Sequence, residues 1–274
     1  MINTIPVAIK PKPIGVVRSP ISNRDIMPPS GEMAKILVFP EYARALKRIE
    51  EYSHLWVLAW LHQAEREVLT AVPSKVNPTV PSFGVFALRS PSRPNPIALS
   101  LVPLIKREGD CLEVKGLDVI DGTPVLDIKP YFEHDTVFSP CSPYIPARKK
   151  ETMTQALWGQ ALNHHGEECT DLKLAVRMGL FIEERLGYLK NPELKLKVIG
   201  SPCLADCLQG LTRARLANPP RFAYQEDPEV KKVIWTKGQE IIFMTVVPKL
   251  HSKEIMTLAD EELFTVQKRI SIVR

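Results

Sequence analysis

The sequence lacks long apolar runs and has few cysteines. Its longest uninterrupted apolar stretch, LWVLAWL at 55–61, is far shorter than the ~20 residues of a membrane-spanning helix. The first residues, MINTIPVAIKPKP, have no apolar core of the kind found in secretory signals. Five cysteines are an odd number and so cannot form a complete disulfide framework. These absences predict a protein of the reducing cytoplasm with no membrane segment.

Neither sign of charge dominates the chain. There are 36 lysines and arginines against 31 acidic residues, for a net charge of +5, and no long basic block is present. A modest positive excess permits a polyanionic partner such as RNA without identifying one. With 45% hydrophobic and 24% charged residues, the composition is that of a globular protein.

A length of 274 residues suits two domains of ordinary size. Prolines cluster in SPCSPYIPARKK, residues 139–150, and the hydrophobic periodicity changes after them. Proline clusters of this kind are typical of linkers. We therefore predict one domain over residues 1–145 and a second over residues 146–274.

The first half is predicted to be mainly β, a small barrel or sandwich, because short runs rich in branched and aromatic residues alternate with turn formers. The predicted strands are 13–19, 33–39, 55–61, 83–89, 99–108, 111–120 and 125–132. One helix is predicted at 40–52, which has a proline at its start and apolar residues at Ala43, Leu46 and Ile49.

The second half is predicted to be α+β. Helices are expected at 152–165, at 171–189 with Asp171 as N-cap, at 203–217, and at 258–270 at the end of the chain. The expected strands are 194–200 and a hairpin that turns at Lys237 and Gly238.

The segment RSPSRPNPIALS, residues 89–100, combines arginines with three prolines. Each proline fixes its own φ and keeps the preceding residue out of the helical region. Arg93 and Asn95 are therefore expected to be extended, with Arg89 and Arg93 able to meet a phosphate or carboxylate in fork geometry. The competing interpretation is a braced surface turn whose arginines are solvated.

The segment GLDVIDGTPVLDIKPY, residues 116–131, interleaves aspartates with strand residues. Asp121 and Gly122 predict a tight turn, which Asp118 and Asp127 would flank. A carboxylate here is able to hold a cationic or hydroxyl-bearing ligand, and backbone amides near Gly122 are able to bind polar edges. An ordinary hairpin tip is the alternative.

Together these segments resemble the TsaA-like family, the TrmO-type tRNA adenine methyltransferases. The resemblance also includes PIGVVRSP at 13–20 and EYSHLWVLAWLHQ at 51–63. It implies a single-sheet β-barrel acting as a homodimer, with the cofactor site near the dimer interface. The implied reaction uses S-adenosylmethionine to methylate the exocyclic nitrogen of a threonylcarbamoyl-modified adenosine beside the tRNA anticodon. The sequence has no GxGxxG loop after a strand, so it lacks the Rossmann fingerprint for a nucleotide cofactor.

The resemblance also implies which side chains form the site. The implied cofactor-binding residues are Pro29, Ser30, Gly31, His62, Gln63, Arg89, Asp121, Gly122, Thr123 and Pro124. The implied substrate-binding residues are Arg93, Asn95, Lys129 and Tyr131. Two departures are Ala98, where the family usually has glycine, and the loose match of PPSGEMA at 28–34 to the family's early cofactor loop.

Catalytic roles are less defined by the sequence. Asp127 and Tyr131 are candidates to accept the proton that the amine loses, and neither is assigned. His62 has the alternative of being a core histidine satisfied by backbone groups. Basic residues available to phosphate are Arg18, Arg24, Arg89, Arg93 and Lys129, and rings available for base stacking are Phe83, Phe86 and Tyr131.

The second half resembles, more distantly, a family of small formylmethanofuran dehydrogenase subunits. The matching residues are His165, Gly166, Cys169, Cys203, Asp206, Gln209, Leu211 and Thr212. Glu167, Thr170, Asp171 and Ala214 depart from that pattern at chemical positions, so no metal is predicted. The alternative is zinc held by His165, Cys169, Cys203 and Cys207.

An accessory role is predicted for the second half, in which basic residues grip tRNA or extend the dimer contact. These are Arg213, Arg215, Arg221, Lys231 and Lys232. Two other functions stay open at this point. One is a nonenzymatic RNA-binding or adaptor protein, and the other is an enzyme of one-carbon metabolism that acts through the second half.

Overall fold

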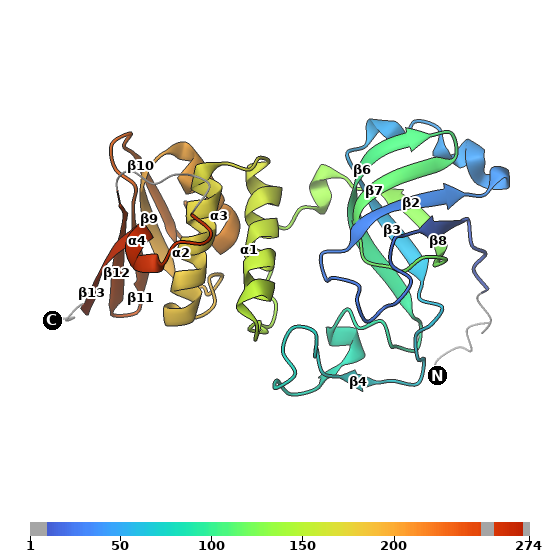
Figure 1. The fold of residues 1–274 in the computed structure, drawn as a ribbon, viewed down its shortest axis with the longest axis horizontal. Coiled ribbons are helices and arrows are strands. Elements are labelled where there is room, and N and C mark those ends of the chain that lie inside the picture. The colour runs from blue at the N-terminus through green and yellow to red at the C-terminus, as the bar shows by residue number, and fades with distance from the viewer. Residues whose placement is uncertain (1–9, 248–254, 271–274) are drawn as a thin grey trace. The chain divides into compact units, whose positions relative to one another are not determined.

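The computed structural model describes residues 10–247 and 255–270 and divides into two compact units, Met1–Thr136 and Val137–Arg274 (Figure 1). The division comes before the predicted boundary at 145/146 because the proline-rich segment packs within the second unit. Ser139 Oγ donates to the carbonyl of Arg213 at 2.9 Å. Tyr144 donates its hydroxyl to Glu183 at 2.8 Å. The linker prolines therefore belong to the second unit by contact.

The first unit is a closed barrel with strand order β1-β2-β7-β6-β3-β8, in which every neighbouring pair is antiparallel. The strands are β1 (Gly15–Arg18), β2 (Glu32–Val38), β3 (His54–Trp60), β6 (Ile97–Glu108), β7 (Cys111–Leu117) and β8 (Pro124–Pro130). Alternate residues such as Leu55, Val57 and Ala59 of β3 are fully buried inside, as a half-buried strand requires. The prediction of a mainly β first domain is confirmed.

The barrel closes at a short seam between β1 and β8. There Gly15 pairs with Val125 and Val16 with Pro124, whereas β3 pairs with β6 along its whole length, from His54 to Trp60.

Two predicted elements of the first unit are wrong. The helix predicted at 40–52 is a pair of 3₁₀ helices, η1 (Pro40–Leu46) and η2 (Ile49–Glu51). Its apolar residues recur every three positions, which suits three residues per turn. The strand predicted at 83–89 is a two-residue strand, β5 (Phe83–Gly84), paired with β4 (Thr70–Ala71) and followed by η3 (Val85–Ala87).

Because all barrel strands alternate in direction, three connections lie at one end of the barrel, which we call the loop end. They are residues 19–31 between β1 and β2, 61–96 between β3 and β6, and 118–123 between β7 and β8. The second of these carries β4 and extends well beyond the barrel (Figure 1).

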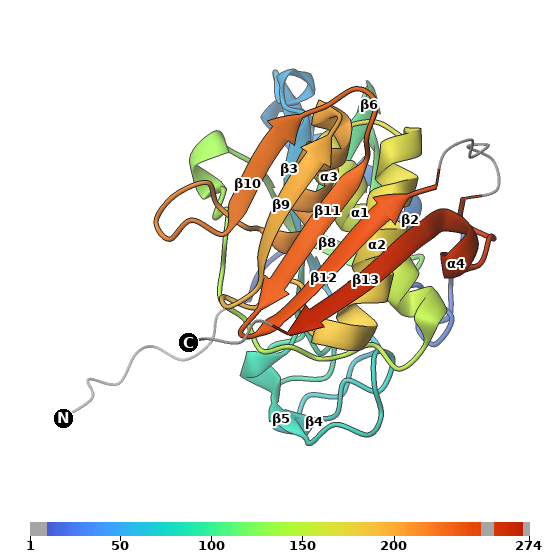
Figure 2. The same cartoon turned by 90° about the vertical axis from the view of Figure 1, so that its left-hand side faces the viewer.

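The second unit is an α+β layer structure, as predicted. A five-stranded sheet of order β10-β9-β11-β12-β13 is covered on one face by helices (Figure 2). The strands are β9 (Lys195–Gly200), β10 (Phe222–Glu226), β11 (Lys232–Lys237), β12 (Glu240–Val246) and β13 (Phe264–Ile270), and the helices are α1 (Lys150–His165), α2 (Thr170–Leu186), α3 (Pro202–Thr212) and α4 (Asp260–Leu263). β9 and β10 are parallel, and the other pairs are antiparallel. The predicted hairpin at Lys237 and Gly238 is confirmed.

Three details of the second unit differ from prediction. The closing helix predicted at 258–270 is the short α4 followed by β13, which completes the sheet beside β12. The N-cap of α2 is Cys169, whose sulfur accepts from Leu172 N at 3.3 Å, and not Asp171. The helix predicted at 203–217 ends at Thr212 because Arg213 takes a left-handed conformation, with φ of 50°.

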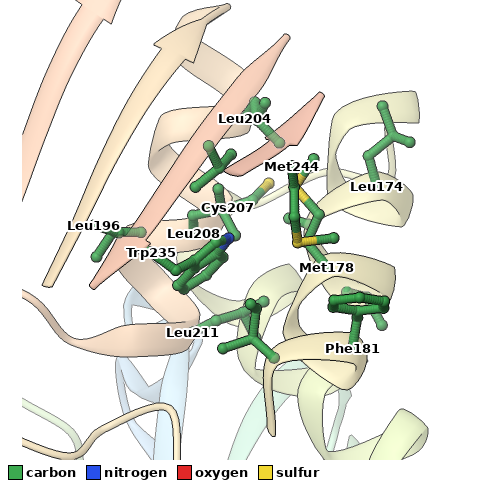
Figure 3. Close-up of a cluster of buried hydrophobic side chains, with 14 of the residues drawn as sticks. Leu174, Met178, Phe181, Leu196, Leu204, Cys207, Leu208, Leu211, Trp235 and Met244 are labelled. Atoms are coloured by element: carbon green, nitrogen blue, oxygen red, sulfur yellow. The ribbon is translucent and has the colours of Figure 1, made fainter. Parts of the chain in front are cut away.

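The core of the second unit lies between the helices and the sheet (Figure 3). Trp235 of β11 is fully buried there beside Leu196 of β9 and residues of α3, among them Cys207 and Leu211. In the described part of the chain, no helix has the length and apolar character needed to span a membrane.

Candidate functional site

The three connections of the loop end are tied to one another by hydrogen bonds. Asp121 N donates to the carbonyl of Ile21 at 2.7 Å, which joins the turn 118–123 to the segment 19–31. Lys75 Nζ donates to the carbonyl of Arg24 at 2.8 Å. Arg24 Nη1 in turn donates to the carbonyl of Gln63 at 3.3 Å. The segments that carry the sequence motifs therefore form one surface.

The carboxylate of Asp121 is oriented by groups at and just after the end of β1. Its Oδ1 accepts from Ser19 N at 3.1 Å, and its Oδ2 lies 3.6 Å from Arg18 Nη1. The side chain is still 38% exposed. An oriented and accessible carboxylate is suited to bind hydroxyl or ammonium groups of a ligand.

The backbone amides of the same turn are not available, which corrects the expectation that they bind a ligand. Asp121 N donates to Ile21, Gly122 N donates to the carbonyl of Val17 at 2.9 Å, and Thr123 N donates to that of Ile120 at 3.3 Å. Thr123 is fully buried, and its hydroxyl donates to Ile120 as well. Gly122 and Thr123 thus shape the turn, and Asp121 presents its polar group.

The segment Pro29–Ser30–Gly31 packs directly on the end of β7. Gly31 has a φ of +66°, and a Cβ at this position would lie 2.4 Å from the carbonyl carbon and oxygen of Gly116. Gly116 itself has a φ of +77°. The two backbone segments are thus so close that only glycine fits at position 31. Pro29 and Ser30 are exposed.

Arg93 organises the long connection from within. Its Nε donates to the carbonyl of Ser90 at 2.9 Å, and its Nη2 donates to the carbonyls of Val85 and Leu88. Because these three carbonyls all point toward the guanidinium of Arg93, residues 83–89 do not form the predicted strand. The structure gives Arg93 a role in ordering the loop, and its contact with substrate stays a prediction.

Several other predicted site residues are exposed on the same connection. These are His62, Gln63, Arg89 and Asn95. Because His62 is exposed, the alternative of a core histidine is wrong. Phe86 is 81% exposed, so its ring is free to stack on a planar group.

Lys129 and Tyr131 lie elsewhere. β8 starts at the loop end and runs to the opposite end of the barrel, where Lys129 faces Trp56 and Tyr131 N donates to the carbonyl of His54. Lys129 Nζ pairs with Asp127 at 2.7 Å. Seven residues of strand span about 20 Å, so one barrel does not bring these residues to Arg93 and Asn95. Tyr131 is likewise far from the loop end, whereas Asp127 lies midway along β8, opposite Leu58; neither is assigned as the base.

The loop end carries a second carboxylate, that of Asp118, for which the sequence predicted only a position beside the turn. Asp118 is exposed and accepts a hydrogen bond from the hydroxyl of Ser100, a buried residue of β6. Lys75, which joins two of the connections, lies outside the quoted motifs, and Ser100 ends the motif 89–100 without having been given a role. Their partners are distant in sequence, so no local pattern identifies them.

The first unit is therefore a small closed antiparallel barrel that carries an oriented carboxylate and a closely packed glycine loop at one end. Residues 16–135 match a family model described as the tRNA-methyltransferase O N-terminal domain. A relative from Escherichia coli, described as tRNA (adenine(37)-N6)-methyltransferase, is 38% identical over 240 residues, covering 81% of this chain and 87% of that protein. The chain therefore belongs to the tRNA-methyltransferase O family.

Two archaeal relatives are each described as a probable S-adenosyl-L-methionine-binding protein. The one from Methanothermobacter thermautotrophicus is 48% identical over 129 residues, covering 46% of this chain and 91% of that protein. The one from Archaeoglobus fulgidus is 38% identical over 216 residues, or 75% of this chain. This chain spans 58% of the length of the A. fulgidus protein.

A solved structure gives a further comparison. The crystal structure of TrmO from Pseudomonas aeruginosa aligns with a TM-score of 0.41 and 21% identity, covering 89% of this chain and 94% of that one.

The alignment with the E. coli protein covers 81% of the chain and so extends past the first unit, which ends at Thr136. The second unit is therefore part of what the two proteins share. The resemblance of this unit to a small formylmethanofuran dehydrogenase subunit stays a prediction.

Proposed function

We propose that this chain transfers the methyl group of S-adenosylmethionine to the exocyclic amine of the threonylcarbamoyl-modified adenosine beside the anticodon of tRNA. The observation that carries the proposal is the meeting of all three motif-bearing connections at the loop end of the barrel. The E. coli relative, whose description names adenine 37 and its N6 atom, supports this target. The five free cysteines suit a reducing cytoplasm.

The residues at the loop end fit the cofactor. The Asp121 carboxylate, oriented by Ser19 N, offers two acceptors for hydroxyl or amino groups. The Pro29–Gly31 segment lies on another connection of the loop end, and the exposed Arg89 supplies a cation for a carboxylate. When bound, S-adenosylmethionine supplies a methyl group whose bond to sulfur breaks, with the electron pair returning to sulfur, as the amine lone pair forms the new C–N bond.

The chain's own contribution to the reaction is placement. Holding the amine in line with the methyl group replaces a bimolecular encounter, and such placement is worth up to ~7–11 kcal/mol of the barrier. The loop end achieves this through connections fixed by Arg93, Lys75 and Asp121. The amine also releases a proton, which passes to water or to a residue that is not assigned.

The test is nucleoside mass spectrometry of tRNA incubated with the purified chain and methyl-labelled S-adenosylmethionine. Two tRNA preparations are compared, one with and one without the threonylcarbamoyl group. Label on the modified adenosine in the first preparation supports the proposal. Label on guanosine or ribose would overturn the proposed target, and an absence of both label and cofactor binding would overturn the activity in favour of an adaptor.

Replacing Asp121 with asparagine is expected to weaken S-adenosylmethionine binding about tenfold to a hundredfold. The amide keeps an oxygen for Ser19 N but loses the charge that strengthens a hydrogen bond to the ligand, a difference of about 1.5–3 kcal/mol. Isothermal titration calorimetry measures the change. Asp110→Asn, an exposed aspartate in the β6–β7 turn away from the loop end, is the matched control, and equal loss in both variants would contradict the assignment.

A homodimer follows from the same proposal. The outward face of β6 carries an apolar strip of Ile97, Leu99, Leu101 and Ile105, each 38–53% exposed. Exposed apolar strips of this kind are typical of protein interfaces. A second barrel on this strip would also supply a second Lys129 and Tyr131, which one barrel holds away from its own loop end.

Leu99→Glu is expected to convert the dimer to a monomer, because a charge would be buried without a partner in the interface. Size-exclusion chromatography with light scattering measures the mass. The control is Leu216→Glu, which places the same charge on a 66% exposed leucine of the second unit. A wild-type monomer, or a dimer that survives Leu99→Glu, would contradict this interface.

A further inference from the structure

In the second unit, a cluster of sulfur and nitrogen ligands lies where α1 ends, α2 begins and α3 passes beside them. Nε2 of His165, the last residue of α1, lies 3.4 Å from Cys169 Sγ. One ligand atom from each of His165, Cys169 and Cys207 lies within 4.8 Å of the others. Three elements of the fold thus direct metal-binding atoms to one point.

The imidazole of His165 is held in the orientation that metal binding needs. Its Nδ1 hydrogen-bonds to Asp206 at 2.8 Å, and its side chain is 9% exposed. With Nδ1 engaged by a carboxylate, Nε2 is left facing the sulfurs. Histidines that bind zinc commonly use one ring nitrogen for the metal and donate the other to a carboxylate.

The cysteine sulfurs near His165 are also positioned to bind a metal ion. Cys169 caps α2, and its sulfur accepts a hydrogen bond from Leu172 N at 3.3 Å, which fixes the position of the sulfur at the start of the helix. Cys203 lies one helical turn before Cys207 on α3, near Cys169. It is not one of the three clustered residues, but its position makes it the candidate for the fourth ligand.

We propose that the second unit binds one zinc ion through His165 Nε2 and the sulfurs of Cys169, Cys203 and Cys207. A three-sulfur, one-nitrogen set is typical of structural zinc. In a tetrahedron with Zn–S bonds of about 2.3 Å, neighbouring ligand atoms lie about 3.5–3.8 Å apart. The 3.4 Å between His165 Nε2 and Cys169 Sγ agrees with that spacing.

A catalytic thiol is the alternative use of the same residues, because Cys169, His165 and Asp206 are hydrogen-bonded in series. A nucleophile needs one accessible sulfur. Here the sulfurs of Cys169 and Cys207 converge with the imidazole of His165, and Cys207 is fully buried. The convergence and the burial favour a closed metal site that joins α1, α2 and α3.

The direct test is elemental analysis of the full chain purified without chelator, followed by replacement of zinc with cobalt(II). We expect one zinc ion per chain, and for the cobalt form the intense visible bands of tetrahedral coordination with thiolate-to-cobalt charge transfer. Cys169→Ser and Cys203→Ser are expected to weaken the charge-transfer band and to lose zinc to a chelating dye. Serine is itself a good helix N-cap, so Cys169→Ser preserves the start of α2.

Cys141→Ser is the control, since Cys141 is exposed in the proline-rich segment outside the cluster. It should retain zinc and the cobalt spectrum in full. Asp206→Asn is expected to lower zinc affinity about 10–100-fold with the cobalt bands kept in position, as befits a residue that orients a ligand.

A wild-type chain without zinc that gives no thiolate charge-transfer band with cobalt(II) under reducing conditions would overturn the proposal. Preferential alkylation of Cys169 by iodoacetamide, unchanged by added zinc, would instead assign the cluster to thiol chemistry. Neither readout involves methyl transfer, so these outcomes are independent of the proposed function.

Discussion

Replacing Gly31 with alanine is expected to destabilise the first unit by about 2–5 kcal/mol and to abolish cofactor binding. The left-handed φ of +66° costs alanine about 1–2 kcal/mol. The added Cβ would also lie 2.4 Å from backbone atoms of Gly116, and relieving such a clash by a backbone shift costs about 1–3 kcal/mol. Urea unfolding followed by tryptophan fluorescence measures the stability, and calorimetry measures S-adenosylmethionine binding.

Gly109→Ala provides the matched control for this substitution. Gly109 has a similar φ, +60°, but a Cβ there meets no atom within 4 Å. It should therefore show the conformational cost alone, with cofactor binding intact. Equal losses for the two variants would show that conformation, and not the contact between residues 31 and 116, limits the site.

Replacing Arg177 with methionine is expected to destabilise the second unit by about 3 kcal/mol. Arg177 is 7% exposed, and its guanidinium donates to the carbonyl of Ile255 at 2.6 Å and to Asp260 at 2.7 Å. Methionine fills the space but leaves the carboxylate and the carbonyl without these donors, and breaking a buried pair in this way costs about 3–5 kcal/mol. The Asp260 side chain is 24% exposed, so the lower part of that range applies.

The measurement is again denaturant unfolding, with Arg148→Met, at an exposed position, as the control. Combining Arg177→Met with Asp260→Asn tests the pairing itself. The double variant should lose less stability than the two single variants together, because each removes the same interaction. Strict additivity would show that the pairing of Arg177 with Asp260 does not contribute to the stability.

Much of the fold could be predicted because strand alternation is a local signal. The strands β6, β7 and β8 lie within about two residues of their predicted starts. The failures occur where distant groups decide the structure. Residues 264–270 form a strand because β12 offers an edge, and no signal within FTVQKRI reveals that partner.

In the candidate site, too, the local segments could be predicted from the sequence, and the contacts between distant residues could not. Motif segments identified the connections that meet at the loop end, and Arg89 is exposed on one of them. The inward direction of Arg93 depends on the carbonyls of a loop whose path the sequence does not define. The separation of Lys129 from the loop end depends on strand direction in the closed barrel. Cysteine spacing indicated the cluster of the second unit, but the alignment of Asp206 with His165 required the packing of α1 against α3.

Because few residues pair at the seam between β1 and β8, we expect the barrel to open locally there more readily than between its other strands. Gly15 and Val16 pair with β8, and backbone hydrogen bonds also link Ile14 to Val125 and Val17 to Thr123. This ladder is shorter than the one between β3 and β8, so we expect local opening of the barrel to start here. The turn bearing Asp121 directly precedes β8 and is fastened to Ser19, just beyond β1. A ligand bound by this turn would link both sides of the seam, and we expect it to slow amide hydrogen exchange in β1 more than in the better-paired strands.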